Sequence, residues 1–226
     1  MTAVRLRVVS YNVHGLRDDG TAVARVLRDL DPDVAFVQEL PKYLLWRGRA
    51  ASFARRADLL YAAGGGTTGG TALFTAVRVD LREVQEHRLR RTPGLTRRGL
   101  VLARLEKDGV VFGAGSLHLG LDAGERARHL TDITGLVNRL SLSAMVLGGD
   151  VNEVSTAPTW TRLASQYTDA GANDPTPTFP VAQPQHRIDG LFVRGADVTA
   201  YRVVDTPDAR VASDHFPVVA DLTLRG

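Results

Sequence analysis

The opening of the chain, residues 1–38, constrains the fold more than any other part of this sequence. Residues 4–11 alternate well enough to predict a strand, and residues 21–30 carry apolar side chains at helical spacing behind Gly20. Asp31-Pro32-Asp33 ends that helix, because the residue before a proline is disfavoured in the α region. Residues 34–38 form a short, continuous apolar run, as expected of a strand buried on both faces. The chain is therefore predicted to begin with a strand, a helix and a buried strand.

The rest of the chain continues with strands and helices, and some strands are joined as hairpins. Further strands are predicted at residues 59–62, 71–77, 84–89, 100–105, 110–117, 145–147, 187–193, 198–204 and 216–224, and further helices at 41–57 and 125–140. The turn Lys107-Asp108-Gly109 indicates one hairpin, and residues 155–184 are predicted to be mostly loop with one short helix. Because too many strands lie in hairpins for a purely parallel sheet, we expect an α/β fold with two mixed sheets packed face to face and helices outside.

The composition is that of an ordinary globular chain, with 44% hydrophobic and 23% charged residues and no compositional break. We therefore expect a single domain over residues 1–226. Cysteine is absent, which excludes disulfides, thiolate zinc sites and a cysteine nucleophile. The amino terminus lacks a secretory signal and no apolar run is long enough to cross a bilayer, so we expect a cytoplasmic protein without integral membrane association. The net charge of +3 permits a polyanionic partner without requiring one.

Polar side chains interrupt or directly follow the buried strands at six places. These places are Asn12, Gln38-Glu39, His118, Asp150-Val151-Asn152, Asp189 and Ser213-Asp214-His215. Carboxylate and amide oxygens are hard ligands that suit Mg²⁺ or Mn²⁺, and magnesium commonly also accepts the phosphate oxygens of a substrate. Imidazoles can stabilise or protonate phosphoryl oxygens as negative charge develops. If the sheets align these strand ends, the chain has a pocket suited to a phosphate ester.

In this order the six motifs resemble the endonuclease/exonuclease/phosphatase superfamily, which includes DNase I and the neutral sphingomyelinases. The resemblance extends from Ser10-Tyr11-Asn12 to Ser213-Asp214-His215-Phe216-Pro217-Val218 and so covers nearly the whole chain. It implies a four-layer α/β sandwich and metal-dependent hydrolysis of a phosphate ester. Two departures concern the branch within the superfamily: Tyr11 replaces a tryptophan, and Gly70-Thr71 replaces the usual Gly-Asn.

The resemblance also implies roles for individual residues. Glu39 would be the principal ligand of Mg²⁺ or Mn²⁺, and Asn12 and Asp214 would help to hold the metal or its waters. Asp150 would orient or deprotonate the attacking water. The remaining catalytic positions are Asn152, which would hold the phosphate and the water, His215, which Asp189 would orient beside the scissile phosphate, and His118, which would donate to the phosphate or the leaving group.

Each of these residues also has an ordinary structural explanation, such as an Asx turn at Asp150 and Asn152. Six separate coincidences in one family order are needed to explain them all in this way, so we favour the catalytic interpretation. Other residues receive the ordinary interpretation: His14, His87 and His129 as structural groups, Trp46, Trp160 and Phe179 as buried aromatics, and Arg82, Arg88, Arg90, Arg91, Arg97 and Arg98 as a solvated face.

The sequence thus predicts a metal-dependent phosphoesterase that hydrolyses a phosphodiester, with DNA or RNA as the favoured substrate because of the basic pI and His118. One alternative is a phosphodiesterase or phosphatase acting on a phospholipid or a small molecule. Another is a non-catalytic nucleic-acid-binding module. We expect the protein to be a monomer.

Overall fold

Two six-stranded sheets form the centre of the protein, whose computed structural model describes residues 3–225. The first sheet has the order β11 (Ala196–Val203), β12 (Val218–Arg225), β1 (Ala3–Asn12), β2 (Val34–Gln38), β4 (Ala72–Thr75) and β3 (Leu60–Gly64). The second has the order β5 (Asp80–Arg88), β6 (Gly99–Lys107), β7 (Val110–His118), β8 (Met145–Asp150), β10 (Asp189–Arg194) and β9 (Thr168–Asp169). In each sheet only the two central strands are parallel, β1 with β2 and β7 with β8. Both sheets are therefore mixed, as predicted.

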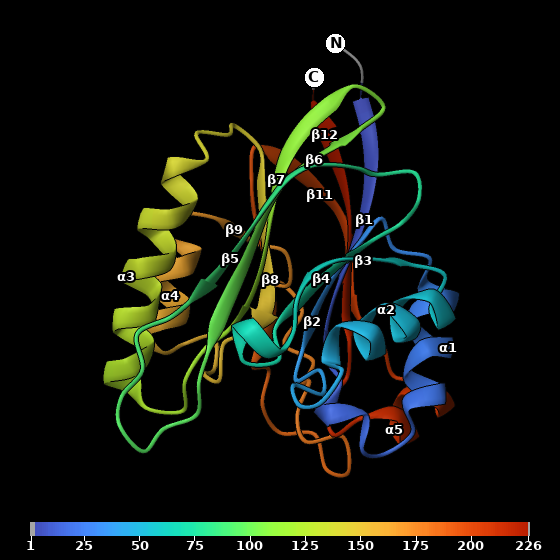
Figure 1. The fold of residues 1–226 in the computed structure, drawn as a ribbon. Coiled ribbons are helices and arrows are strands. Elements are labelled where there is room, and N and C mark those ends of the chain that lie inside the picture. The colour runs from blue at the N-terminus through green and yellow to red at the C-terminus, as the bar shows by residue number, and fades with distance from the viewer. Residues whose placement is uncertain (1–2, 226) are drawn as a thin grey trace.

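Five α-helices cover the outer faces of the two sheets (Figure 1). The first sheet is covered by α1 (Gly20–Leu30), α2 (Trp46–Arg56) and α5 (Pro207–Ala212). The second is covered by α3 (Ala123–Arg139) and α4 (Pro158–Ala164). Two short 3₁₀ helices, η1 (His14–Leu16) and η2 (Gly66–Thr68), follow β1 and β3. The resulting order of helix, sheet, sheet and helix is the four-layer sandwich that the resemblance implies.

Three apolar cores hold the layers together. The inner core lies between the sheets and includes Phe36 and Leu191, and the outer cores include Phe53 on α2 and Ile133 on α3. The two sheets approach closely at Gly148 of β8, where an added Cβ would lie 2.2 Å from the ring of Phe36. A glycine at this position lets β8 pack against β2. This close packing brings the central strands of the two sheets into contact.

The segment before α2 differs from the prediction, because the helix expected over residues 41–57 begins only at Trp46. Leu44 and Leu45 have φ angles of 20° and 57°, which are outside the right-handed helical region. Tyr43, Leu44 and Leu45 are 77%, 78% and 78% exposed, so no buried surface holds them in a helix. This apolar run is an exposed loop. None of the helices in residues 3–225 has the length and hydrophobicity needed to span a bilayer.

Candidate active site

The strand register brings the predicted residues to one edge of the two packed sheets. In the first sheet, Asn12 at the end of β1 pairs with Gln38 at the end of β2. In the second sheet, Asp150 at the end of β8 lies between His118 of β7 and Asp189 of β10. Because the central strands of both sheets end on the same side, residues from opposite sheets meet there.

Asp150 is the centre of the resulting hydrogen-bond network. Asn12 Nδ2 donates to Asp150 Oδ2 over 3.0 Å, across a sequence separation of 138 residues. The Nε2 atoms of His118 and His215 lie 3.3 Å and 3.9 Å from the same oxygen. The Asp150 side chain is almost completely buried, as are the other three. Three of the predicted residues, Asn12, His118 and His215, therefore converge on one oxygen of a fourth, Asp150.

The imidazole of His215 is in contact with Asp189 and with an aromatic ring. His215 Nδ1 lies 2.9 Å from Asp189 Oδ2, and the hydroxyl of Thr178 accepts hydrogen bonds from the backbone N–H groups of Ile188 and Asp189. The ring of Phe179 packs against the imidazole, with 4.6 Å between the ring centroids. The ring of His215 is thus fixed on one edge by a carboxylate and on one face by an aromatic group.

Electrostatics separate the charge states of the two histidines. Burial alone would lower the pKa of His215, but the adjacent carboxylates of Asp189 and Asp150 outweigh it and raise this pKa to about 10. Burial, together with the charge of Arg98, lowers the pKa of His118. Burial favours the neutral form of Asp150, but His118, His215 and the backbone N–H of residue 152 outweigh it and lower the pKa of Asp150. At neutral pH the site therefore contains an ionised Asp150 and a protonated His215.

Asp150 and Asn152 form an Asx turn, the ordinary structural role of these two residue types. The backbone N–H of Asn152 donates to Asp150 Oδ1 over 2.8 Å, and its side-chain Nδ2 donates to the carbonyl of Leu119 over 3.0 Å. The left-handed φ of 54° at Asn152 is one that asparagine tolerates better than most residues. The turn leaves Asp150 Oδ2 facing Asn12 and the two imidazoles, so the turn and the polar cluster coexist.

Glu39 and Asp214 lie at the rim of this cluster and are half-buried. Glu39 follows β2 and lines a cavity of about 440 Å³ together with Arg98. Asp214 Oδ2 lies 3.8 Å from Nε2 of His14, whose backbone N–H donates to Asn12 Oδ1 over 3.1 Å. Asn12 connects both carboxylates with the buried network, because it pairs with Gln38, the residue before Glu39, and accepts the hydrogen bond from His14.

The donor chemistry of this region fits a hard divalent cation. Asp150, Asp189 and His215 each offer an atom within 4.8 Å of the others, a geometry compatible with a metal ion. Asp189 and His215, however, already bond to each other, which occupies the imidazole Nδ1. The half-buried carboxylates of Glu39, which lines the cavity, and of Asp214, together with the amide of Asn12, offer oxygen atoms of the kind that Mg²⁺ and Mn²⁺ prefer.

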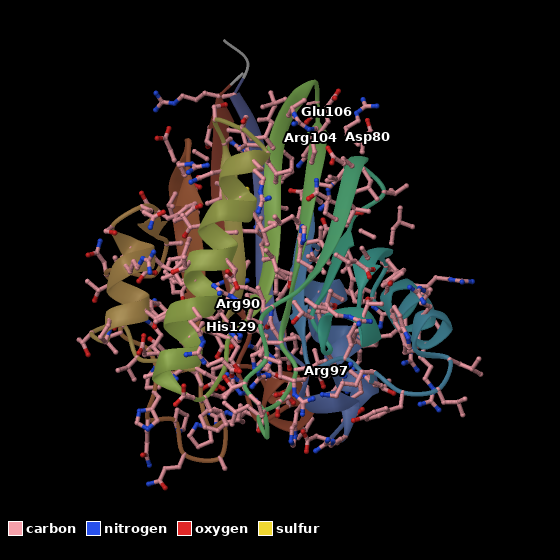
Figure 2. The ribbon with its side chains drawn as sticks, turned by 60° about the vertical axis from the view of Figure 1, so that its left-hand side comes forward. Asp80, Arg90, Arg97, Arg104, Glu106 and His129 are labelled. Carbon is pink, nitrogen blue, oxygen red and sulfur yellow. The ribbon has the colours of Figure 1, made fainter. Side chains whose placement is uncertain are left out.

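Arg98 also belongs to this network, although the sequence pattern of neighbouring arginines indicates a solvated face. Arg98 is half-buried, and its Nη1 lies 2.9 Å from His118 Nδ1. By contrast, the side chains of Arg90 and Arg97 lie at the surface (Figure 2). The predicted hairpin contained a signal for Arg98: the pairing of Lys107 with Val110 continues to the pairing of Leu100 with Leu117, which places residue 98 next to the end of β7.

Of the three aromatic residues expected to be buried, Trp46 and Phe179 are instead partly exposed. Trp160 is buried, as expected. Trp46 is half-exposed and packs beside Gly65, where an added Cβ would lie 2.6 Å from the indole. Phe179 contacts His215, and His14 lies near Asp214, so these two belong to the surroundings of the site.

The four-layer fold is shared by a family of hydrolytic phosphoesterases. A family model for the endonuclease/exonuclease/phosphatase family matches residues 9–215. The chain belongs to this family. A comparison with curated proteins found no matching sequence.

Solved structures with the same fold come from bacteria and animals. An endonuclease/exonuclease/phosphatase family protein from Bacteroides thetaiotaomicron is 20% identical with a TM-score of 0.85, and 100% of each chain is covered. The mannosyl-6-phosphatase Bt3783 of the same organism is 20% identical with a TM-score of 0.80, covering 96% of this chain and 99% of that one. D. rerio TDP2 complexed with a single-strand DNA product is 16% identical with a TM-score of 0.74, covering 96% and 98%. At these identities the similarity establishes the fold.

Proposed function

We propose that the protein is a metal-dependent phosphoesterase that hydrolyses a phosphodiester by direct attack of water. The observation that carries this proposal is the buried, ionised Asp150, which Asn12 and two imidazoles surround at the meeting point of the two sheets. Glu39, with Asn12 and Asp214, would hold Mg²⁺ or Mn²⁺ at the rim. A divalent cation, when bound, neutralises charge on the phosphoryl oxygens.

In the proposed reaction Asp150 accepts a hydrogen bond from the attacking water and orients its oxygen toward phosphorus. A bond forms between this oxygen and phosphorus while the ester bond on the opposite side breaks, and one proton of the water passes by way of Asp150 and solvent to the leaving oxygen. His215, protonated and held by Asp189, stabilises the negative phosphoryl oxygens. His118 donates a hydrogen bond to the same group, and Asn152 supports the position of Asp150 through its backbone N–H. No covalent intermediate is needed.

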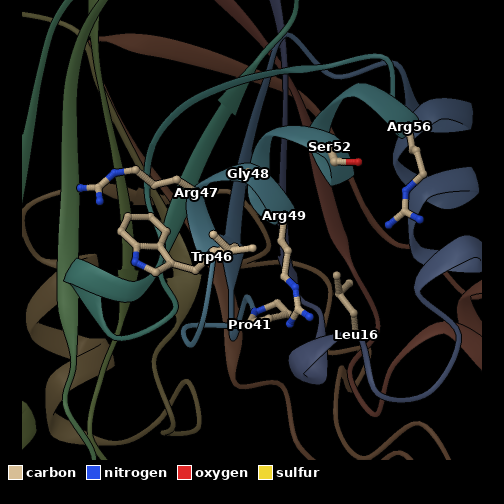
Figure 3. A pocket seen from close by; sticks show the side chains of 9 residues that line it. Leu16, Pro41, Trp46, Arg47, Gly48, Arg49, Ser52 and Arg56 are labelled. Atoms are coloured by element: carbon tan, nitrogen blue, oxygen red, sulfur yellow. The ribbon is translucent and has the colours of Figure 1, made fainter.

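A nucleic acid is the substrate that the surface beside the site supports best. An apolar cavity of about 700 Å³ is formed by α2 and the segments that contain Leu16 and Pro41 (Figure 3). Pro41 also lines the cavity that contains Glu39 and Arg98, so the two cavities are neighbours. Besides Arg98, five cationic residues line the two cavities without forming an ion pair with any acidic group in residues 3–225: Arg17, Lys42, Arg47, Arg49 and Arg56. Cationic groups bind backbone phosphates, and apolar surface accommodates bases.

Unpaired cations and exposed apolar residues occur together on this surface. Tyr43, Leu44 and Leu45 are exposed in the loop just before α2, and Leu45 lines the apolar cavity. The solved structure of TDP2 with a single-strand DNA product supports a nucleic acid as substrate. The mannosyl-6-phosphatase supports a small phosphate ester as the alternative. The cavity of about 440 Å³ that Glu39 and Arg98 line is large enough for such a molecule.

A substrate panel tests this proposal. Purified protein with Mg²⁺ or Mn²⁺ is incubated with single-stranded DNA, duplex DNA, RNA, sphingomyelin and mannose 6-phosphate, alongside bis-p-nitrophenyl phosphate. We expect metal-dependent turnover of a phosphodiester, and loss of turnover by about 100-fold or more in Asp150→Asn. The matched control Asp197→Asn changes an exposed carboxylate on β11 and should retain full activity. Turnover that survives both excess EDTA and Asp150→Asn contradicts the proposal.

A further inference from the structure

Arg98 is placed against a single nitrogen of the candidate active site. It lies immediately before β6, and its backbone carbonyl accepts a hydrogen bond from Leu89 over 3.1 Å. The next residue, Gly99, packs so closely on Thr68 that an added Cβ would lie 2.5 Å from the Thr68 carbonyl oxygen. These contacts fix the backbone from which the guanidinium reaches His118.

The contact between Arg98 and His118 has only one possible polarity. A guanidinium donates hydrogen bonds and accepts none, so His118 Nδ1 must be the acceptor at 2.9 Å from Arg98 Nη1. The proton of a neutral imidazole then lies on Nε2. In the structure Nε2 lies 3.3 Å from Asp150 Oδ2, so the N–H of His118 faces the carboxylate at the centre of the site.

The groups around His118 have opposing effects on the charge of its ring. Asp150 from β8 and Glu39 after β2 are both negative and would favour a cationic imidazole, and burial and the positive charge of Arg98 oppose them. Arg98 itself is held at a cost, because its Nε is buried without a hydrogen-bond partner in residues 3–225. A partly desolvated cation aimed at one ring nitrogen indicates a specific role for the contact.

We propose that Arg98 is a positioning residue that keeps His118 Nδ1 an acceptor, so that His118 acts as a neutral hydrogen-bond donor through Nε2. This role rests on the proposed function, and it divides the work between the two histidines. With substrate bound, the Nε2–H that faces Asp150 would be available to donate a hydrogen bond to the phosphate, from a ring that carries no charge. His215, which is bonded to Asp189, supplies the positive charge.

The protonation of the ring nitrogens is measured directly by long-range ¹H–¹⁵N NMR correlations, with and without added Mg²⁺. In the wild-type protein we expect His118 to show an unprotonated Nδ1 and a protonated Nε2 at neutral pH. Arg98→Lys retains a donor and should preserve this pattern, as should Arg97→Met, which alters the exposed neighbour. Arg98→Met removes the donor, and Nδ1 should then gain a proton.

A protonated Nδ1 in the wild-type spectrum overturns the proposal, and so does an unchanged pattern in a folded Arg98→Met. If Arg98→Met does not fold, the wild-type and Arg98→Lys spectra still decide the matter. Kinetics provide the second measurement: kcat for bis-p-nitrophenyl phosphate should fall about 10- to 100-fold in Arg98→Met, with KM changed less, and Arg98→Lys should recover part of kcat. An equal loss in Arg98→Lys contradicts the positioning role. An inactive wild-type protein would refute the proposed function, whereas the state of Nδ1 would still be read from the spectrum.

Discussion

The pair of Asp189 and His215 should make the stability of the folded protein depend on pH in a defined window. The pKa of His215 is raised from 6.5 to about 10 in the folded protein. Because the folded state keeps a proton that the unfolded chain releases near pH 6.5, this pair stabilises the fold fully below that pH. The stabilisation is lost as the pH rises toward about 10.

The size of this effect follows from proton linkage. A difference of one bound proton changes the free energy of unfolding by about 1.4 kcal/mol per pH unit, so the wild-type protein should lose about 3 kcal/mol between about pH 7 and pH 9. Asp189→Asn removes the carboxylate 2.9 Å from His215 Nδ1, which should lower the pKa of His215 and flatten most of this dependence. The chain contains no cysteine, so no thiol titrates in the same window.

The measurement is urea denaturation of both proteins across this pH range, with EDTA present to exclude metal binding at the site. The exposed Asp197→Asn variant is the control and should keep the wild-type dependence. A wild-type free energy of unfolding that stays constant between about pH 7 and pH 9 would refute the reasoning. An equally steep dependence in Asp189→Asn would also refute it.

Three further predictions concern the packing of the sheets, helix α3 and the nucleic-acid surface. Gly148→Ala should lower the free energy of unfolding by about 1–3 kcal/mol, because its Cβ would lie 2.2 Å from the Phe36 ring; chemical denaturation measures this. In α3, Gly135→Ala meets no atom within 4 Å and should stabilise the protein by about 0.5–1 kcal/mol, and a loss of stability there would contradict the packing argument. Arg56→Glu should weaken binding of a labelled single-stranded oligonucleotide at least about tenfold at low salt, measured by fluorescence anisotropy in EDTA. Arg55→Glu, which changes a residue of α2 outside the cavity lining, should weaken it less, and equal losses in both variants would exclude a specific role for the cavity.

Local sequence patterns were sufficient for the two mixed sheets and for the strand ends that carry Asn12, His118 and Asp150. The alternation of apolar and polar side chains shows which faces of a strand are buried. This pattern is complete within a few residues, so it can be recognised without knowing the partner strand. The same logic failed before α2, where the apolar side chains of Leu44 and Leu45 predicted a helix but belong to an exposed loop. An apolar side chain shows a buried face only if another surface covers it.

The contacts that make the cluster chemically specific depended on the tertiary structure. Asn12 and Asp150 lie 138 residues apart and meet because the central strands of two different sheets end on the same side. Arg98 looked like one of several surface arginines until the register of β6 and β7 placed it against His118. The sequence alone therefore determined which side chains end the strands, because that information is local. Which of those side chains touch, and with what charge, was decided by sheet order and packing, because hydrogen bonds and pKa values depend on neighbours that are distant along the chain.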